Sequence, residues 1–269
     1  MNYTLERINT NNIVKIVVDG VGGVGKTTML KKLESGKFDP ETKLTIGVDF
    51  FTKEYYHFNG RKVVAQFWDL VGAQRFNFLR SLSYKGANCI ILVYDLTRPN
   101  SIENIDFFVN MARKFNIYSD QIILVGTKSD LFYDRRLDPS FLNSFIEKDK
   151  FAEILETSAR NNHNIDALFE LATGLAMFNK RMINENDFKM LRKDLKERIK
   201  EPSIESHEKI IRKCWNCDRT IYFYEFHDTN SRLISEERLL ELWENPIIQF
   251  YCCSCFKKFY TIKKHSKIL

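Results

Sequence analysis

The chain has 269 residues, with 44% hydrophobic and 28% charged side chains, a composition that excludes disordered and fibrous proteins. This length suits one ordinary domain joined to a smaller one. The net charge of +6 permits contact with acidic surfaces without requiring it. No apolar run approaches the roughly 18 residues that a membrane helix requires, and residues 1–12 lack the apolar core of a signal peptide. We therefore expect a cytoplasmic protein, with any membrane recruitment coming from a partner or from the basic tail.

The first 180 residues alternate between apolar, β-rich runs and segments with helical periodicity. Two of the predicted strands are joined at Asn59-Gly60, which is a strong hairpin signal. The predicted strands are 13–19, 48–58, 61–69, 88–95 and 121–127, and the predicted helices are 27–33, 102–115, 139–147 and 164–180. Strands that alternate with helices predict an α/β fold, in which a mostly parallel sheet is covered by helices on both faces.

The composition changes after residue 180. Residues 184–201 are rich in charge and carry apolar side chains at helical spacing, and Pro202 ends this predicted helix. The helix either packs on the first domain or forms an arm for a partner, and its apolar side of about four turns is too short for a long coiled coil. We predict a first domain at 1–180, a charged helical linker at 181–210 and a small zinc-ribbon-like α+β domain at 211–269. In this last domain the predicted elements are a strand at 221–226, a helix at 235–243, and a final strand with the second cysteine pair at 247–260.

A phosphate-binding motif follows the first predicted strand. Residues 20–27 read GVGGVGKT and fit the pattern G-x-x-x-x-G-K-[ST] between a strand and a helix. Glycines allow successive backbone N–H groups to curl around a phosphate, and the helix N-terminus adds its dipole. Lys26 would neutralise the β- and γ-phosphates, and the Thr27 hydroxyl would ligate Mg²⁺. The residues expected to touch the nucleotide here are Gly20, Gly22, Gly23, Val24, Gly25, Lys26, Thr27 and Thr28.

Two later segments favour guanine over adenine as the base. The Asp130 carboxylate can accept hydrogen bonds from two N–H groups of guanine, a donor pair that adenine lacks. The aliphatic stem of Lys128 can lie along the ring. Residues 156–159, which read ETSA, follow another predicted strand and can offer a backbone N–H to the guanine carbonyl oxygen. The predicted base-binding residues are Thr127, Lys128, Asp130, Ser158, Ala159 and Arg160.

With these motifs, residues 10–180 resemble a small GTPase of the Ras superfamily, closest to the Rab branch. Five motifs occur in the family's order, namely GVGGVGKT at 20–27, TIGVDF at 45–50, WDLVGAQRF at 68–76, TKSD at 127–130 and ETSA at 156–159. The resemblance implies a P-loop NTPase fold, bound GTP or GDP with Mg²⁺, and hydrolysis of GTP to GDP and phosphate. It also implies vesicle trafficking and partners that act as effectors, exchange factors and activating proteins. We expect a monomer.

The resemblance also implies roles for four residues outside the phosphate motif. Thr45 would join Thr27 around Mg²⁺ only when a γ-phosphate is present, and Asp69 would hold the ion through water. Gly72 would donate its N–H to the γ-phosphate. Phe38 falls at the spacing of the family's aromatic residue that packs on guanine, although a core position is the alternative.

The second-switch motif departs from the family where catalysis is concerned. The glutamine that orients the attacking water follows the glycine directly in the family, and here that position is Ala73. Gln74 comes one residue later, where an extended backbone points the side chain the other way. Either Gln74 reaches the water through a rearranged loop, or a partner supplies the missing group, such as an arginine. We favour the second interpretation and predict slow hydrolysis, with Gln74 and Thr45 as the remaining catalytic candidates.

Four cysteines near the C-terminus have metal-binding spacing. Cys214 and Cys217 form one C-x₂-C pair, Cys252 and Cys255 form another, and 34 residues separate the pairs. Two such pairs complete a tetrahedral Zn²⁺ site, which would stabilise a segment of about 60 residues that is too short for a sufficient core. A redox dithiol and unliganded buried cysteines are the alternatives.

The last thirteen residues contain five lysines and no acidic residue. They form either a solvated surface or a contact with acidic membrane or nucleic acid. No cysteine lies near the terminus, so we expect no prenyl anchor. Three functions follow from the sequence: a GTP-hydrolysing switch, a persistently GTP-bound adaptor that uses its zinc domain, and a nucleic-acid-associated factor.

Overall fold

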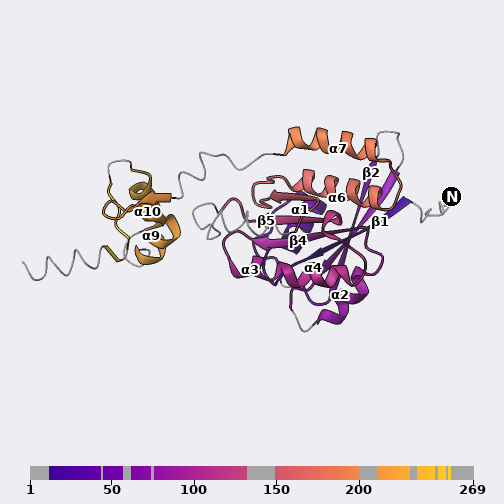
Figure 1. The fold of residues 1–269 in the computed structure, drawn as a ribbon, viewed down its shortest axis with the longest axis horizontal. Coiled ribbons are helices and arrows are strands. Elements are labelled where there is room, and N and C mark those ends of the chain that lie inside the picture. The colour runs from indigo at the N-terminus through magenta and orange to yellow at the C-terminus, as the bar shows by residue number, and fades with distance from the viewer. Residues whose placement is uncertain are drawn as a thin grey trace, which may run out of the picture. The chain divides into compact units, whose positions relative to one another are not determined.

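The computed structural model describes residues 12–43, 45–56, 62–73, 76–131, 149–199, 211–230, 235–245, 248–252 and 254–255. These residues divide into two compact units (Figure 1). The first unit contains residues 12–130 and 149–199, and the second contains the described part of 211–255. No helix among the described residues is long and apolar enough to cross a membrane.

The first unit is built on a six-stranded sheet with the strand order β2-β3-β1-β4-β5-β6. The β2 strand runs antiparallel to β3, and all other neighbouring strands are parallel. The strands are β1 (Ile13–Asp19), β2 (Val48–Tyr56), β3 (Lys62–Leu70), β4 (Cys89–Asp95), β5 (Ile122–Thr127) and β6 (Glu153–Glu156). The β4 and β5 strands are buried along their whole length, because helices cover both faces. The predicted α/β fold is therefore confirmed.

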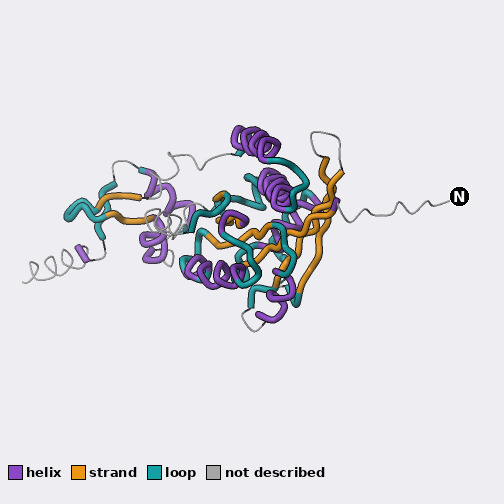
Figure 2. The backbone as a smooth tube through the Cα atoms, turned by 45° about the vertical axis from the view of Figure 1, so that its right-hand side comes forward, coloured by secondary structure: helices purple, strands orange, loops and turns teal. Residues whose placement is uncertain are grey.

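Helices pack on both faces of this sheet, so that the strands lie between them (Figures 1 and 2). On one face lie α1 (Lys26–Ser35) and α6 (Ile165–Asn179), which bury side chains such as Met29 and Leu168 against β1 and β3. On the other face lie α2 (Asn77–Tyr84), α3 (Asn100–Glu103) and α4 (Ile105–Arg113), where Phe108 joins a second hydrophobic cluster. The short 3-10 helix η3 (Ser119–Gln121) precedes β5.

The charged helix after residue 180 packs on the first unit as α7 (Glu185–Arg198). Asn184 caps it, because its side-chain oxygen accepts a hydrogen bond of 2.9 Å from the Asp187 backbone N–H. Leu191 and Leu195 are buried in the same cluster as α6. A Cβ atom at Gly174 would lie 2.0 Å from the Leu191 side chain, so the absence of a side chain there lets the two helices approach closely. The domain limits at residues 180 and 210 stay a prediction.

The second unit combines a short hairpin with two helices. The strands β7 (Ile211–Lys213) and β8 (Thr220–Tyr222) are antiparallel, and α9 (Phe223–Asn230) and α10 (Glu236–Glu244) follow. Among the described residues of this unit, the buried core is small and consists of Cys214, Ile221, Phe223, Leu239, Trp243, Phe250 and Cys252. Two of the seven core residues are therefore cysteines of the predicted metal site.

The prediction of a strand from Ile221 to Phe226 was wrong beyond Tyr222, because the chain continues there as α9. Phe223 and Phe226 are three residues apart, and both rings pack on Trp243, at centroid distances of 5.4 and 5.5 Å. This spacing places both side chains on one face of a helix. The Glu225 carboxylate also accepts a hydrogen bond of 3.1 Å from the Tyr222 backbone N–H at the start of the helix.

Other elements differ in detail from the sequence prediction. The predicted helix 102–115 is interrupted at Asn104 between α3 and α4, and α2 was not predicted. Among the described residues of the predicted final strand, Phe250 forms only an isolated bridge with Cys214. The predicted helix 139–147 and the Asn59-Gly60 turn lie outside the described residues.

Candidate functional site

The predicted nucleotide-binding segments meet at one edge of the sheet. They follow the carboxyl ends of β1, β3, β5 and β6, and these four strands are parallel members of the same sheet. The carboxyl ends of parallel strands lie at the same edge, where ligands of open α/β sheets bind. The topology therefore collects the phosphate motif, the second switch and both base motifs in one place.

The phosphate loop joins β1 to α1 in a backbone conformation that requires glycine. Gly20 has φ +146°, and a Cβ atom there would lie 2.2 Å from the Val93 carbonyl oxygen. Gly25, at φ +101°, directly precedes α1. Lys26 is buried, and its Nζ donates hydrogen bonds of 2.8 and 3.0 Å to the carbonyl oxygens of Gly20 and Val21. Its charge is therefore held inside the loop, where desolvation lowers the pKa of Lys26 although nearby carboxylates oppose that shift.

The first turn of α1 and both switch segments bring three oxygen donors together. The Thr27 hydroxyl lies 2.6 Å from the Thr45 hydroxyl and 2.5 Å from Asp69 Oδ2, and Thr45 lies 3.1 Å from the same carboxylate oxygen. Asp69 Oδ1 is buried and has no hydrogen-bond partner among the described residues. Burial raises the pKa of Asp69, although hydrogen bonds from both threonines and the charge of Lys26 oppose this. Hard oxygen donors with a spare carboxylate oxygen fit Mg²⁺.

The second-switch segment lies directly against the phosphate loop. A Cβ atom at Gly72 would lie 2.2 Å from the Gly22 backbone nitrogen, so no other residue fits there without movement. The Val71 backbone N–H donates a hydrogen bond of 3.0 Å to the Gly47 carbonyl oxygen next to the first switch. Ala73 follows with only a methyl group. Gln74 lies outside the described residues, so its catalytic role stays a prediction.

The two predicted base motifs are in direct contact. The Ser158 hydroxyl donates a hydrogen bond of 2.6 Å to Asp130 Oδ1, and the Arg160 guanidinium lies 4.0 Å from Oδ2. Backbone hydrogen bonds join the loops, from the Ser129 N–H to the Thr157 carbonyl and from the Thr157 N–H to β5. The Asp130 carboxylate is therefore oriented from one side and offers its remaining lone pairs to a ligand.

Lys128 and Thr127 connect the base motif to neighbouring strands. Lys128 has φ +63°, and its Nζ lies 2.7 Å from Asp95 Oδ2 at the end of β4. Burial opposes ionisation of Asp95, but hydrogen bonds from Lys128 and Thr97 lower its pKa. The Thr127 hydroxyl lies 2.5 Å from the Val24 carbonyl oxygen, so this side chain supports the phosphate loop from below.

Three further predicted residues lie around these loops. Phe38 follows α1 and is 37% exposed, which excludes a core position and leaves its packing on guanine as a prediction. Thr28 lies in the first turn of α1 and is half-buried. Ala159 follows Ser158 in a turn and packs partly against the core of the first unit.

Sequence reasoning missed a buried charged cluster beneath the phosphate loop. Asp19 is 0% exposed and Arg80 of α2 is 1% exposed, and the Arg80 Nε lies 2.9 and 3.2 Å from the two carboxylate oxygens. The Tyr84 hydroxyl donates a third hydrogen bond of 2.9 Å to Asp19. The sequence did contain one signal of this cluster, namely an acidic residue at the end of an apolar strand. A carboxylate buried at such a position requires a polar or charged partner.

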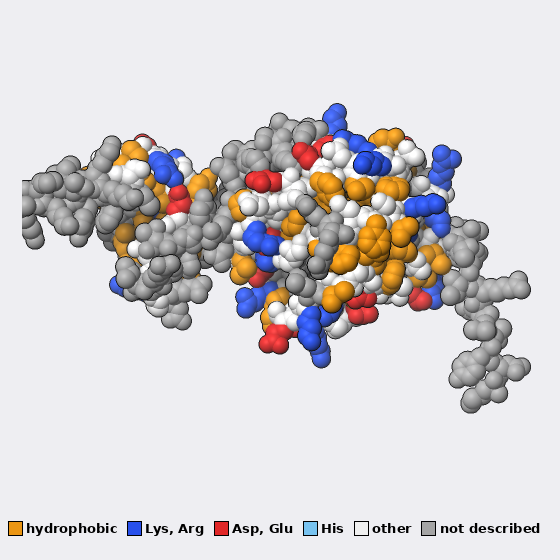
Figure 3. Space-filling view, turned by 90° about the horizontal axis from the view of Figure 1, so that it is seen from below, with side chains coloured by type: hydrophobic (Ala, Val, Ile, Leu, Met, Phe, Trp, Pro, Cys, Tyr) orange, Lys and Arg blue, Asp and Glu red, His pale blue; other side chains and the backbone are white. Residues whose placement is uncertain are grey.

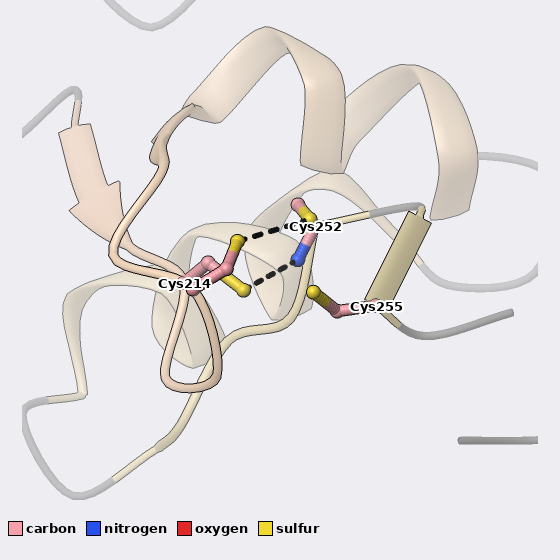
Figure 4. A group of neighbouring side chains, drawn as sticks. Cys214, Cys252 and Cys255 are labelled. Atoms are coloured by element: carbon pink, nitrogen blue, oxygen red, sulfur yellow. Dashed lines mark hydrogen bonds between the residues drawn. The ribbon is translucent and has the colours of Figure 1, made fainter. Parts of the chain in front are cut away.

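The second unit brings the four predicted cysteines together (Figure 4). The sulfur atoms of Cys214, Cys217, Cys252 and Cys255 lie within 4.8 Å of one another, and all four cysteines are free. The sulfur atoms of Cys217 and Cys252 are 3.8 Å apart, well beyond the about 2.05 Å of a disulfide. A tetrahedron with metal–sulfur bonds of about 2.3 Å has edges of about 3.8 Å. The cluster therefore has the dimensions of a Cys₄ zinc site.

The backbone around Cys214 favours the thiolate that a metal requires. Burial opposes its ionisation, but backbone N–H groups of Cys252, Asn216 and Cys217 donate to the sulfur and lower the pKa of Cys214 to about 6. The Cys252 nitrogen lies 3.3 Å from the Cys214 sulfur. The two cysteine pairs are therefore connected through backbone donors as well as through a shared centre.

Exposed apolar side chains lie in or near both switch segments. Figure 3 shows hydrophobic side chains gathered on the face where α2 lies. Phe50 of β2 and Phe78 and Leu82 of α2 are exposed, as is Ile46, which follows Thr45. Phe78 and Leu82 are four residues apart, so they share one face of α2. Exposed apolar patches of this kind indicate protein contacts.

Comparison with known proteins identifies the family. A sequence profile of the Ras family matches residues 15–177. Ras-related protein Rab-19 of Xenopus laevis is 35% identical over 176 residues, which cover 65% of this chain and 79% of that protein. Rab-11C of Dictyostelium discoideum is 37% identical over 158 residues, covering 59% of this chain and 70% of that protein. Rab-12 of Homo sapiens is 32% identical over 156 residues, or 58% and 64% of the two chains. The chain belongs to the Ras family and is similar to Rab proteins.

Proposed function

We propose that this Ras-family protein, a GTP-binding switch by descent, hydrolyses GTP slowly and recruits partners while GTP is bound. The observation that supports this proposal most is that three groups of side chains lie at one edge of the sheet. These are the buried Lys26 in the phosphate loop, the oxygen cluster around Asp69, and the oriented Asp130 carboxylate. Phosphate, magnesium and guanine recognition thus each have a matching group.

At the phosphate end, each residue has a distinct role in this proposal. Lys26 neutralises the β- and γ-phosphates, and Thr27 and Thr45 hold Mg²⁺ together with Asp69. Mg²⁺, when bound, supplies positive charge that offsets the charge developing on the transferred phosphoryl group. Gly72 donates its backbone N–H to the γ-phosphate, a contact that GDP cannot make.

The experiment that tests this function is competition for a fluorescent GTP analogue. We expect GTP and GDP to displace the analogue and ATP to leave it bound, because adenine lacks the donor pair that Asp130 accepts. Asp130→Ala removes two hydrogen bonds to a charged acceptor, and we expect it to weaken GTP binding by roughly 100-fold or more. The matched control is Asp149→Ala, which removes an ion pair of 2.7 Å with Arg113 away from the base motifs. Equal displacement by ATP and GTP would contradict the proposal.

Slow hydrolysis rests on Ala73. Its methyl group cannot orient a water molecule, whereas the family's glutamine at this position does. Without a partner that supplies a polar group, the protein would hold GTP for a long time and act as an adaptor. A persistent GTP state would keep the apolar surface of Ile46, Phe50, Phe78 and Leu82 in one arrangement for effectors, because this surface borders both switches.

We further propose that the cysteine cluster holds a structural Zn²⁺. The supporting observations are the four free sulfur atoms within 4.8 Å of one another and the backbone donors to Cys214. A redox dithiol is less well supported, because four sulfur atoms surround one centre rather than two approaching to bond distance. In this proposal the second unit is a metal-stabilised module available for protein or nucleic-acid contacts.

A further inference from the structure

The ion pair between Asp19 and Arg80 lies inside the first unit, between the phosphate loop and α2. Such a pair survives burial only when its geometry is excellent and its remaining polar atoms are satisfied. Both conditions hold for the carboxylate. Besides Arg80, Asp19 accepts a hydrogen bond of 2.7 Å from the Gly20 backbone N–H and one of 2.9 Å from the Tyr84 hydroxyl. Burial and the adjacent carboxylate raise the pKa of Tyr84, which therefore keeps its proton and donates.

The other donors of Arg80 are directed at the second switch. Its NH2 group donates a hydrogen bond of 2.9 Å to the Val71 carbonyl oxygen, and its NH1 group donates one of 3.3 Å to the Ala73 carbonyl oxygen. These two carbonyl groups flank Gly72. NH1 also donates a hydrogen bond of 2.7 Å to Asn77 on the same helix. One guanidinium group thus connects α2, the backbone around Gly72 and the start of the phosphate loop.

This arrangement extends to the first switch. The Val71 residue whose carbonyl accepts from Arg80 also donates its N–H to Gly47, two residues after Thr45. The guanidinium is planar and offers five donors in a fixed fork, so it restrains the direction of each carbonyl group as well as its distance. A lysine at the same place could hold Asp19 with its ammonium group but could not reproduce the fork.

Stability alone does not account for the pair. Replacing a buried ion pair by apolar residues of similar size is often neutral or stabilising, so a pair of this kind is weak evidence for a stabilising role. Two of the hydrogen bonds that Arg80 makes besides those to Asp19 go to the backbone on both sides of Gly72, which already lies against Gly22 of the phosphate loop. Those donors therefore hold the backbone next to the phosphate loop rather than a distant part of the core.

We propose that Arg80, held by Asp19, is a positioning residue that fixes the segment Val71–Ala73 so that the Gly72 N–H faces the γ-phosphate. This inference rests on the proposed GTP function. It predicts that Arg80 matters for GTP, whose γ-phosphate meets Gly72, and not for GDP, which ends at the β-phosphate. Arg80 therefore contributes to discrimination between the two nucleotides without touching either one.

The test compares the affinities of a non-hydrolysable GTP analogue and of GDP, both with Mg²⁺. In Arg80→Lys we expect analogue affinity to fall about tenfold, the equivalent of one hydrogen bond to a charged group, and GDP affinity to change less than about twofold. The double variant Asp19→Asn/Arg80→Met removes both charges and keeps an acceptor for Gly20 and Tyr84. It is expected to show the same selective loss even if the lysine variant folds poorly.

The control is Val109→Ala, which makes a cavity in the cluster beneath α4 without touching the charged pair. We expect it to lower the melting temperature and leave the ratio of the two affinities unchanged. In the analogue-bound double variant, hydrogen exchange of amides 71–73 should also be faster than in the unaltered protein, while the amides of β5 keep their protection.

An equal loss of both affinities in the Arg80 variants would overturn the positioning role and leave a purely structural one. Affinities for both nucleotides that match those of the unaltered protein would overturn it as well. If the unaltered protein binds neither nucleotide, the proposed function itself fails and this inference fails with it, a result that the first measurement distinguishes from the other two.

Discussion

The two units obtain their stability in different ways. The first unit buries two large hydrophobic clusters on opposite faces of a six-stranded sheet, and its site is attached to that core by backbone and buried side chains. Among its described residues, the second unit has seven buried core residues, of which two belong to the cysteine cluster. Site substitutions in the first unit should therefore change ligand binding more than folding, whereas in the second unit the site and the fold cannot be separated.

The largest effect is expected from removing the proposed Zn²⁺ of the second unit. Structural zinc contributes about 10–16 kcal/mol in small domains, which matches or exceeds the entire net stability of about 5–15 kcal/mol of a typical folded domain. We expect Cys217→Ser, or treatment with a strong chelator, to lower zinc content below one ion per chain and to abolish the near-UV circular dichroism of Trp215 and Trp243. The measurement is elemental analysis together with the spectrum.

A matched control sharpens this result. Cys253 lies outside the described residues. No cysteine stands three positions before or after it, so it forms no C-x₂-C pair, and Cys253→Ser should keep its zinc. Guanine nucleotide affinity should stay within about twofold in both variants, because the nucleotide site belongs to the first unit. If Cys217→Ser retained one zinc per chain, Cys217 would not be a required zinc ligand, and the proposed Cys₄ site would be contradicted.

The next largest effect concerns Lys26. Lys26→Met removes the buried cation at the phosphate loop and keeps the length of the side chain, so we expect nucleotide affinity to fall by roughly 100-fold or more while the fold persists. Isothermal titration with GDP measures the loss. Lys31→Met, on the solvent-facing side of the same helix, should bind normally. Unfolding of the first unit in Lys26→Met would contradict the expectation that site substitutions in this unit change binding more than folding.

A smaller effect is expected at the second switch. Ala73→Gln restores a side chain that can orient water, and we expect single-turnover GTP hydrolysis to accelerate several-fold without a matching change in GTP affinity. Ser81→Gln, on α2 but away from the phosphate loop, serves as the control. An unchanged or lower rate in Ala73→Gln would show that the missing glutamine does not limit hydrolysis.

The smallest effect is expected at the cap of α7. Asn184→Ala removes the side-chain acceptor of the Asp187 N–H, and we expect the free energy of unfolding of the first unit to fall by about 1 kcal/mol. Asn110→Ala, at an exposed position inside α4, should cost less than about 0.5 kcal/mol. Denaturant unfolding followed by far-UV circular dichroism measures both. A loss confined to the second unit would contradict the packing of α7 on α6.

The sequence predicted those parts of the molecule that depend on local patterns. The phosphate loop, the strands that precede the site motifs and the cysteine pairs each have a short signature, because backbone conformation and ligand spacing are local properties. The pairing of Asp19 with Arg80 has no such signature, since 60 residues separate the partners and Arg80 lies on the unpredicted helix α2.

Other misses have equally physical reasons. Phe223 and Phe226 in a short apolar run suited a strand as well as a helix, and only their packing on Trp243 decides for the helix. The place of Thr127 beside guanine stays a prediction, and the hydrogen bond from its hydroxyl to the Val24 carbonyl oxygen was not foreseen. Such outcomes depend on tertiary contacts that one sequence does not reveal.

The central claim is that the first unit binds guanine nucleotide and hydrolyses GTP slowly. The most direct test is to denature freshly purified protein and to identify the released nucleotide by chromatography. We expect GTP to form a substantial part of what is released, because Ala73 cannot orient the attacking water. Release of GDP alone would contradict slow hydrolysis, and release of adenine nucleotide alone would contradict the assignment of the base site.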